Sequence, residues 1–185
     1  MARTESAMLE LGTQAPRFSL PDVRDGKTHT TESLMGTKGL LVMFICAHCP
    51  FVKHVEKELA RLGKDYHKSG VGIVAISSND AVNYPDDAPP SLAKQAQRLG
   101  FTFPYLYDES QEAARAYDAA CTPDLFLFDR AGKLVYRGQL DASRPGNEVP
   151  VTGKDLRTAL DALIAGKPIS TDQYPSIGCN IKWKQ

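Results

Sequence analysis

The chain has 185 residues, 42% of them hydrophobic and 24% charged, which is typical of a soluble globular protein with one domain spanning residues 1–185. Its 22 basic and 22 acidic side chains cancel to a net charge of zero, and no basic stripe favours nucleic acid or an anionic membrane as a partner. The start, MARTESAMLELG, lacks the apolar stretch of a secretory signal, and no segment is long enough to span a membrane, so we expect a cytoplasmic protein.

The first half of the chain predicts a β-hairpin followed by a βαβ unit. Residues 16–30 suggest two short strands about an Asp-Gly turn, and the unbroken apolar run GLLVMFI at 39–45 predicts a strand covered on both faces. Residues 50–68 change to a helical period, with Pro50 tolerated in the first turn, and the run VGIVAIS predicts the next covered strand. The inward face of this helix comprises Val52, Val55, Leu59, Leu62 and Tyr66, and its polar face comprises Lys53, Glu56, Lys57, Arg61 and Lys64.

The second half predicts elements that cover and extend this unit. A proline-rich connection at 79–90 is long enough to form a lid over a substrate, although a solvated connector is the simpler interpretation. The following elements are a helix near 91–99, a strand near 103–107, a helix near 111–120, a hairpin in DLFLFDRAGKLVYRGQL, and a last helix with a Thr152–Asp155 capping box. The apolar tail, residues 168–185, is expected to dock on the domain. Together these elements predict an α/β fold, a three-layer sandwich with a mixed central sheet and an N-terminal β-hairpin.

The stretch ICAHCPFVKH, residues 45–54, joins the first covered strand to its helix and carries two cysteines. Cys46 follows the strand, where the unpaired N–H groups and positive dipole end of the helix favour a thiolate. Cys49 falls in the first turn on the inward face, and residues three apart there have Cβ atoms about 5–6 Å apart, which a small adjustment converts to disulfide geometry. These positions predict that Cys46 is the exposed attacking thiol and Cys49 the sheltered resolving thiol.

His48 lies between the two cysteines and is the third candidate catalytic residue. A cationic or hydrogen-bonding imidazole would stabilise the Cys46 thiolate and therefore the reduced form, which makes the disulfide more oxidising. Known pairs span roughly −270 to −120 mV, and we expect a potential in the upper half of that range. Lys53 and His54 are further candidates that would add positive charge near the thiols, although their helical positions favour the solvated face.

Metal binding is the main alternative to redox chemistry for the two cysteines. A zinc site would need two more ligands, for which His54 and Cys179 are candidates, but no second closely spaced pair supports them. Copper(I) held by the two thiolates would make the protein a binding module, and a metal titration of the reduced protein separates this from catalysis. Two inert buried cysteines are the simplest alternative. The strand-to-helix position favours a redox dithiol, with no metal ligands expected.

Several segments resemble the thioredoxin-fold redoxins: GTQAPRFSLPD at 12–22, the strand into ICAHCP, the Thr122-Pro123 step and the hairpin FLFDRAGKLVYRG. They are most similar to the peroxiredoxin-like branch of the alkyl hydroperoxide reductase and thiol-specific antioxidant superfamily, and the tail PSIGCNIKW looks like a signature of that branch. The resemblance implies a cis Thr122-Pro123 peptide facing the dithiol. Thr122 would then present its backbone to an extended substrate, and Pro123 would keep metal away from the thiols. Pro50 joins these two as a candidate substrate-binding residue.

The chain departs from two patterns of this superfamily. Thioredoxins carry a Trp before the first cysteine and a buried acid six residues before it, where this chain has Ile45 and Leu40. Peroxiredoxins place Pro and Thr seven and three residues before the peroxidatic cysteine, and neither Cys46 nor Cys49 has them. The groups that shape a peroxide pocket are missing, so disulfide exchange is the expected activity and antioxidant peroxide reduction the alternative.

The sequence thus predicts a thiol–disulfide oxidoreductase that uses a Cys46–Cys49 dithiol and disulfide. Its partners would be a protein or small-molecule disulfide substrate, or a peroxide in the alternative, and an upstream thiol that reopens the disulfide. No organic cofactor is expected, because no glycine-rich phosphate loop is present. Cys121, beside Thr122, and Cys179, in the tail, are further candidates, either redox thiols or inert buried residues.

Overall fold

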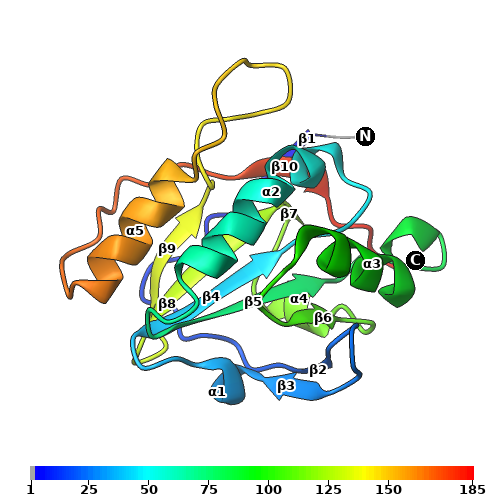
Figure 1. The fold of residues 1–185 in the computed structure, drawn as a ribbon, viewed down its shortest axis with the longest axis horizontal. Coiled ribbons are helices and arrows are strands. Elements are labelled where there is room, and N and C mark those ends of the chain that lie inside the picture. Colours follow the sequence, from blue (N-terminus) through cyan, green and yellow to red (C-terminus); the bar gives the residue numbers. More distant parts are fainter. Residues whose placement is uncertain (1–2) are drawn as a thin grey trace.

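The computed structural model describes residues 3–185 and contains a five-stranded mixed sheet with helices on both faces (Figure 1). The strands lie in the order β6-β5-β4-β8-β9. Their bounds are Gly39–Phe44 for β4, Val71–Ser77 for β5, Tyr105–Tyr107 for β6, Asp124–Asp129 for β8 and Leu134–Gly138 for β9. Because β4 pairs in parallel with β5 and antiparallel with β8, the predicted α/β sandwich with a mixed sheet is confirmed. Met1 and Ala2, which the predicted domain includes, lie outside the described residues.

The helices cover both faces of this sheet. They are α1 (Thr31–Leu34), α2 (Pro50–Asp65), α3 (Pro89–Leu99), α4 (Glu112–Ala116) and α5 (Lys154–Ile164), with a short 3-10 helix, η1, at Pro85–Asp87. Leu41 and Met43 of β4 pack with α2, α3 and α5, whereas Leu40 and Val42 pack with α4 and residues near the N-terminus. Every residue of β4 is therefore buried, as expected for a strand covered on both faces. Within residues 3–185, no helix combines the length and apolarity needed to cross a membrane.

Two smaller sheets flank the main one. The predicted N-terminal hairpin is confirmed: β2 (Ser19–Pro21) pairs antiparallel with β3 (Thr28–Thr30). The other small sheet joins the two ends of the chain in the order β1-β10-β7, with bounds Arg3–Glu5, Ile177–Asn180 and Cys121–Thr122. The apolar tail therefore docks through backbone hydrogen bonds, and β10 lies between β1 and the strand that precedes Pro123 (Figure 1).

Two local predictions are wrong. Glu56, assigned to the polar face of α2, is buried because Arg98 of α3 binds both of its carboxylate oxygens. The last helix has no capping box, since its N-cap is Gly153 in a left-handed conformation without a side-chain cap. Asp141 instead accepts hydrogen bonds from the backbone N–H groups of Thr152 and Gly153. In both places the hydrogen-bond partner comes from a part of the chain that is distant in sequence.

Candidate active site

The Cys-Ala-His-Cys segment links the end of β4 to the start of α2. Cys49 is the N-cap residue and Pro50 the first residue of the helix, where proline removes no intrahelical hydrogen bond. Cys46 and Cys49 are both 0% exposed. The predicted exposure of Cys46 is therefore wrong, because the segment packs against Thr122 from a distant part of the chain.

The Cys49 sulfur has two close partners. It lies 2.7 Å from the Cys179 sulfur, and as a thiol it donates to the Thr122 carbonyl oxygen at 3.3 Å. The hydrogen bond from the Cys46 thiol is the main cause that lowers the pKa of Cys49. Bonds from Cys179 and from the backbone N–H of Val52 add to it, and together they outweigh burial, which raises the pKa. The lowered pKa favours a thiolate on Cys49.

Cys46 has the opposite character. Burial raises its pKa well above the ordinary value, and the hydrogen bond to Cys49 and the negative charge of Asp87 raise it further. The Thr122 hydroxyl, 3.4 Å from the sulfur, lowers the pKa only in part. The directions of these two pKa shifts favour a thiolate on Cys49 over the predicted thiolate on Cys46.

The Thr122-Pro123 peptide bond is cis and lies beside the dithiol, as the resemblance implies. The backbone of Thr122 is not open to a substrate in this conformation, which corrects that expectation. Strand β10 pairs antiparallel with β7 and places Cys179 opposite Thr122. Gly178 permits this approach, since a Cβ at that position would lie 1.9 Å from the Thr122 carbonyl oxygen. The tail thus occupies the strand edge that the resemblance assigns to a substrate.

A fully buried carboxylate, Asp87 of η1, holds the loop between the two cysteines. One oxygen accepts hydrogen bonds from the backbone N–H groups of Ala47 and His48, at 2.8 and 3.0 Å. The other oxygen accepts a hydrogen bond from the Asn79 side chain at 2.7 Å and contacts Nδ1 of His48. Burial alone would raise the pKa of Asp87, but the bonds from His48 and Asn79 outweigh it and lower the pKa. Asp87 therefore stays ionised and ties the 79–90 connection to the dithiol loop.

His48 binds this carboxylate rather than the Cys46 thiolate. The hydrogen bond to Asp87 raises the pKa of His48, and the charge of Cys49 contributes in the same direction. The ring stacks on Tyr84, with ring centroids 5.7 Å apart. Its Nε2 is buried and makes no hydrogen bond with any described residue. His48 therefore hydrogen-bonds Asp87 and not Cys46, its ring nitrogen lies within 4.8 Å of the Cys46 sulfur, and its raised pKa favours the protonated ring.

The sequence did not single out the residues of the 79–90 connection that hold the loop. Asn79 and Asp87 are buried and Tyr84 covers the His48 ring, so the connection is more than a solvated connector. The sole sequence signal is the acidic pair Asp86-Asp87 in a proline-rich segment. Nothing in that pattern distinguishes the exposed Asp86 from the buried Asp87.

Comparisons with known proteins agree with this geometry. A model described as the AhpC/TSA family matches residues 11–137, which include the dithiol and Thr122-Pro123. The chain belongs to the AhpC/TSA family. Thiol-disulfide oxidoreductase ResA from Geobacillus thermodenitrificans is a relative of this chain. The two are 30% identical over 134 residues, which cover 71% of this chain and 70% of that protein.

Solved structures extend the comparison of this AhpC/TSA member. An uncharacterized conserved protein from Geobacillus kaustophilus is 58% identical, with a TM-score of 0.98 over 100% of this chain and 97% of that one. Peroxidoxin BcpB from Mycobacterium tuberculosis shares the fold at 19% identity, with a TM-score of 0.63 over 84% of this chain and 97% of that one. The chain is an oxidoreductase with the thioredoxin fold, as its resemblance to the redoxins implies.

Some predicted residues of this AhpC/TSA member lie apart from the dithiol. Lys53 is exposed, and His54 makes a hydrogen bond to Ser143 at 2.7 Å beside a hollow of about 10 Å³ that Pro123 also lines. The Cys121 thiol donates to the Pro123 carbonyl oxygen at 3.5 Å, and burial raises its pKa. In the described part of the chain, no hydrogen bond joins these three side chains to Cys46 or Cys49.

One trio of ligand atoms within residues 3–185 meets the geometry of a metal site. Cys46, His48 and Asp87 each offer one atom, all within 4.8 Å of one another. The zinc alternative relied on His54 and Cys179, but His54 contacts Ser143 and is not part of this trio. A metal here would compete for a carboxylate that already accepts several hydrogen bonds, so the arrangement favours the hydrogen-bonded loop over a metal site.

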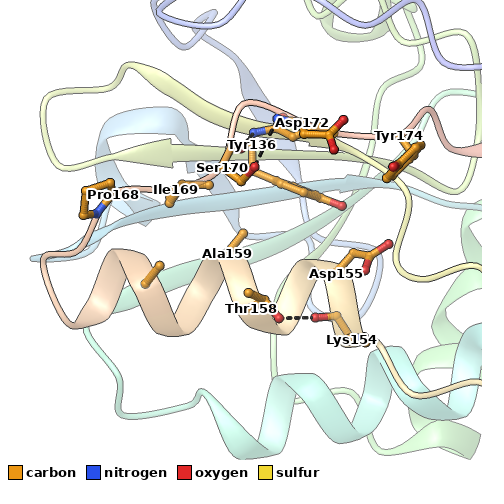
Figure 2. A pocket seen from close by; sticks show the side chains of 12 residues that line it. Tyr136, Lys154, Asp155, Thr158, Ala159, Pro168, Ile169, Ser170, Asp172 and Tyr174 are labelled. Carbon is orange, nitrogen blue, oxygen red and sulfur yellow. Dashed lines mark hydrogen bonds between the residues drawn. The ribbon is translucent and has the colours of Figure 1, made fainter.

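A separate cavity lies away from the dithiol. It has a volume of about 240 Å³ and lies between α5 and the tail segment 168–174, with Tyr136 and Ala159 among its lining residues (Figure 2). None of the cysteines lines it. We therefore place the candidate active site at the dithiol by its chemistry, since a cavity without reactive side chains offers no redox group.

Proposed function

We propose that this protein exchanges thiols with disulfides through Cys46 and Cys49, with Cys49 as the attacking thiolate. The observation that carries the proposal is the Cys49 sulfur at the N-cap of α2, 2.7 Å from the Cys179 sulfur and beside the cis peptide, with its pKa lowered to about 5. A thiolate is the species that attacks a disulfide, and a helix N-terminus favours it. The activity in the name of the ResA relative supports the same reaction.

In the reducing direction, the Cys49 thiolate attacks one sulfur of a substrate disulfide and forms a mixed disulfide, which releases the other sulfur as a thiolate. His48 is placed to protonate that thiolate, because its Nε2 has no partner among the described residues. Cys46 then attacks the Cys49 sulfur and expels the second substrate thiolate, which takes up the proton that Cys46 loses. A Cys46–Cys49 disulfide is left, and an upstream thiol reductant reopens it without any organic cofactor.

The charge on Cys49 controls when Cys46 becomes reactive. The hydrogen bond to Cys49 and the charge of Cys49 raise the pKa of Cys46 in the reduced protein. Formation of the mixed disulfide removes the charge of Cys49, so the pKa of Cys46 falls. Cys46 therefore ionises more easily at the stage when it must attack the mixed disulfide. Neither cysteine is exposed, so a substrate reaches them only after a covering segment moves. The 79–90 connection is one such segment, because Asp87 ties it to the dithiol loop.

Peroxide reduction is the second candidate function, supported by the family match and by the low pKa of Cys49. It would oxidise Cys49 to a sulfenic acid, which a neighbouring thiol converts to a disulfide. To separate the two, fully reduced protein is mixed with insulin or with hydrogen peroxide, quenched at intervals with a thiol alkylator and weighed. We expect fast loss of the Cys46 and Cys49 thiols with insulin and slow loss with peroxide. The reverse order would make peroxide reduction the primary function.

Copper(I) binding by the dithiol is the third candidate function and belongs to the binding class. Titration of the reduced protein with copper(I) against a competing chelator tests it. Tight binding together with slow reaction toward insulin and peroxide would replace the redox proposal. A cytoplasmic location and a protein or small-molecule disulfide as partner complete the proposal.

Removal of the His48 ring is expected to make the disulfide more reducing. In His48→Ala, the cationic side chain beside the Cys49 thiolate is gone, so the reduced form loses stabilisation. A tenfold change in the equilibrium constant corresponds to about 30 mV, and we expect a shift of roughly that size toward negative potential. Equilibration with glutathione buffers, followed by alkylation, measures it. His67→Ala alters an exposed histidine and is the matched control, and an unchanged potential in His48→Ala would remove His48 from the mechanism.

A further inference from the structure

Cys179 lies outside residues 11–137, which the family model matches, yet its sulfur is 2.7 Å from the Cys49 sulfur. The backbone N–H of Phe51 also makes a hydrogen bond to the Cys179 sulfur. The two sulfurs therefore share the first turn of α2, and Cys49 has one thiol neighbour from its own loop, Cys46, and a second from the tail.

Backbone pairing on both sides fixes the position of Cys179. In the small sheet, Cys179 lies opposite Arg3 of β1 and opposite Thr122 of β7. The side chain is buried, and Gly178 brings the strand into close contact with Thr122. A disulfide has an S–S distance of about 2.05 Å, so a small movement of either side chain joins the two sulfurs. The contact between the two sulfurs is therefore held by the backbone pairing of β10 with β1 and β7.

We propose that Cys179 is a second resolving thiol, which captures Cys49 from a mixed disulfide and forms a Cys49–Cys179 disulfide. This inference rests on the proposed function, since it requires Cys49 to attack a substrate. It assigns the tail strand β10 a chemical role: the strand delivers a thiol along the edge of β7, where the resemblance places a substrate backbone.

The reaction balances without a further oxidant. Cys49 attacks the substrate disulfide, forms the mixed disulfide and releases one substrate thiol. Cys179 then loses its proton and attacks the Cys49 sulfur; the new S–S bond forms as the mixed S–S bond breaks and the second substrate thiol leaves. The substrate disulfide is reduced to two thiols, and Cys49 and Cys179 are oxidised. An existing Cys46–Cys49 disulfide can pass to the same state when Cys179 attacks Cys49 and Cys46 leaves.

The charges around Cys179 suit this order of events. Burial and the hydrogen bond to Cys49 raise the pKa of Cys179, and the ammonium group of Lys182 opposes this rise. When Cys49 enters a mixed disulfide its negative charge is lost, so the pKa of Cys179 falls. Cys179 is therefore held as a thiol before substrate attack and becomes easier to ionise afterwards.

Peptide mapping separates the two resolving routes, because trypsin places the cysteines on three peptides. Residues 39–53 carry Cys46 and Cys49, residues 116–130 carry Cys121, and residues 158–182 carry Cys179. Reduced Cys46→Ser protein is treated with glutathione disulfide, alkylated at intervals, digested and weighed. A Cys49–Cys179 bond links peptide 39–53 to peptide 158–182. Two double variants serve as controls. Cys46→Ser/Cys179→Ser lacks the proposed resolving thiol. Cys46→Ser/Cys121→Ser lacks a buried thiol that lies outside the site.

We expect the linked peptides to accumulate in Cys46→Ser and in Cys46→Ser/Cys121→Ser. The glutathione adduct on Cys49 should decay at least about tenfold faster there than in Cys46→Ser/Cys179→Ser, because the attacking thiol is already in place. A lasting adduct on Cys49 with Cys179 still alkylated would overturn this inference and leave the proposed function intact. Absence of any adduct on Cys49, in these variants and in the wild-type protein, would overturn both. The same mapping on oxidised wild-type protein, with fragmentation of the linked peptides to show that the bond is on Cys49 and not on Cys46, makes the result independent of whether the variants fold.

Discussion

Replacement of Cys49 by serine is expected to lower the rate of insulin reduction by about a thousandfold or more, because it removes the attacking atom. Cys46→Ser should behave differently. Its first reaction with a disulfide should stay within about tenfold of the wild-type rate, since Cys49 keeps its place at the N-terminus of α2 and its contact with Cys179, and the serine hydroxyl can still donate to its sulfur. The rapid-quench measurement follows mixed-disulfide formation on Cys49 in a single turnover and, separately, multiple turnover with insulin.

Cys121→Ser is the control for these two variants, because Cys121 is also buried but binds the Pro123 carbonyl oxygen rather than the dithiol. It should retain near wild-type rates in both measurements. If Cys46→Ser loses the first step and Cys49→Ser retains it, the roles assigned here are reversed and the positional prediction from the sequence is correct after all.

Asp87→Asn is expected to destabilise the protein by about 3 kcal/mol, because it removes a buried charge whose partners stay behind. The carboxylate accepts hydrogen bonds from Ala47, His48 and Asn79, and an amide can accept on one oxygen only. For a chain of this length the loss corresponds to a fall in melting temperature of roughly 6–12 °C. Asp86→Asn changes the adjacent exposed carboxylate and should leave the melting temperature within about 2 °C.

The difference between wild type and Asp87→Asn should depend on pH. The pKa of Asp87 is lowered in the folded protein, so its contribution to stability is present above the unfolded value of about 3.9 and is lost as pH falls through the folded pKa. The pKa of His48 is raised, so its contribution is complete below about 6.5 and is lost as pH rises through the folded pKa. The difference in melting temperature should therefore be largest between about pH 4 and 6.5. An equal difference at pH 5 and pH 9 would show that the ion pair with His48 does not contribute.

Much of the fold could be predicted from local patterns. The apolar run that became β4 is buried on both faces, and Val52, Val55, Leu59 and Leu62 all face the core from α2. Strand and helix periods depend on residues only a few positions apart, so a single sequence carries this signal. The position of the cysteine pair between β4 and α2 follows from the same patterns, and so does the turn in the N-terminal hairpin.

Helical periodicity cannot predict which of the two cysteines ionises, for a physical reason. The sequence places Cys46 at the helix start to within a few residues, but the N-cap residue is Cys49, and its lowered pKa favours the thiolate there. Burial and the nearby charge of Asp87 then disfavour a thiolate on Cys46. Burial and the effect of a nearby charge change over distances of a few ångströms, and helical periodicity does not resolve such distances.

The sequence by itself determined the redoxin fold, the dithiol and its place at the end of a central strand, because each depends on patterns among residues that are close together in the sequence. Only the tertiary structure decided the partners of that dithiol. Asp87 reaches Ala47 across 40 positions, and Cys179 reaches Cys49 across 130. Such contacts depend on how the sheet, η1 and the tail strand pack together. Hydrogen bonds and sulfur contacts act over about 3–4 Å, so they exist only after the whole chain has folded.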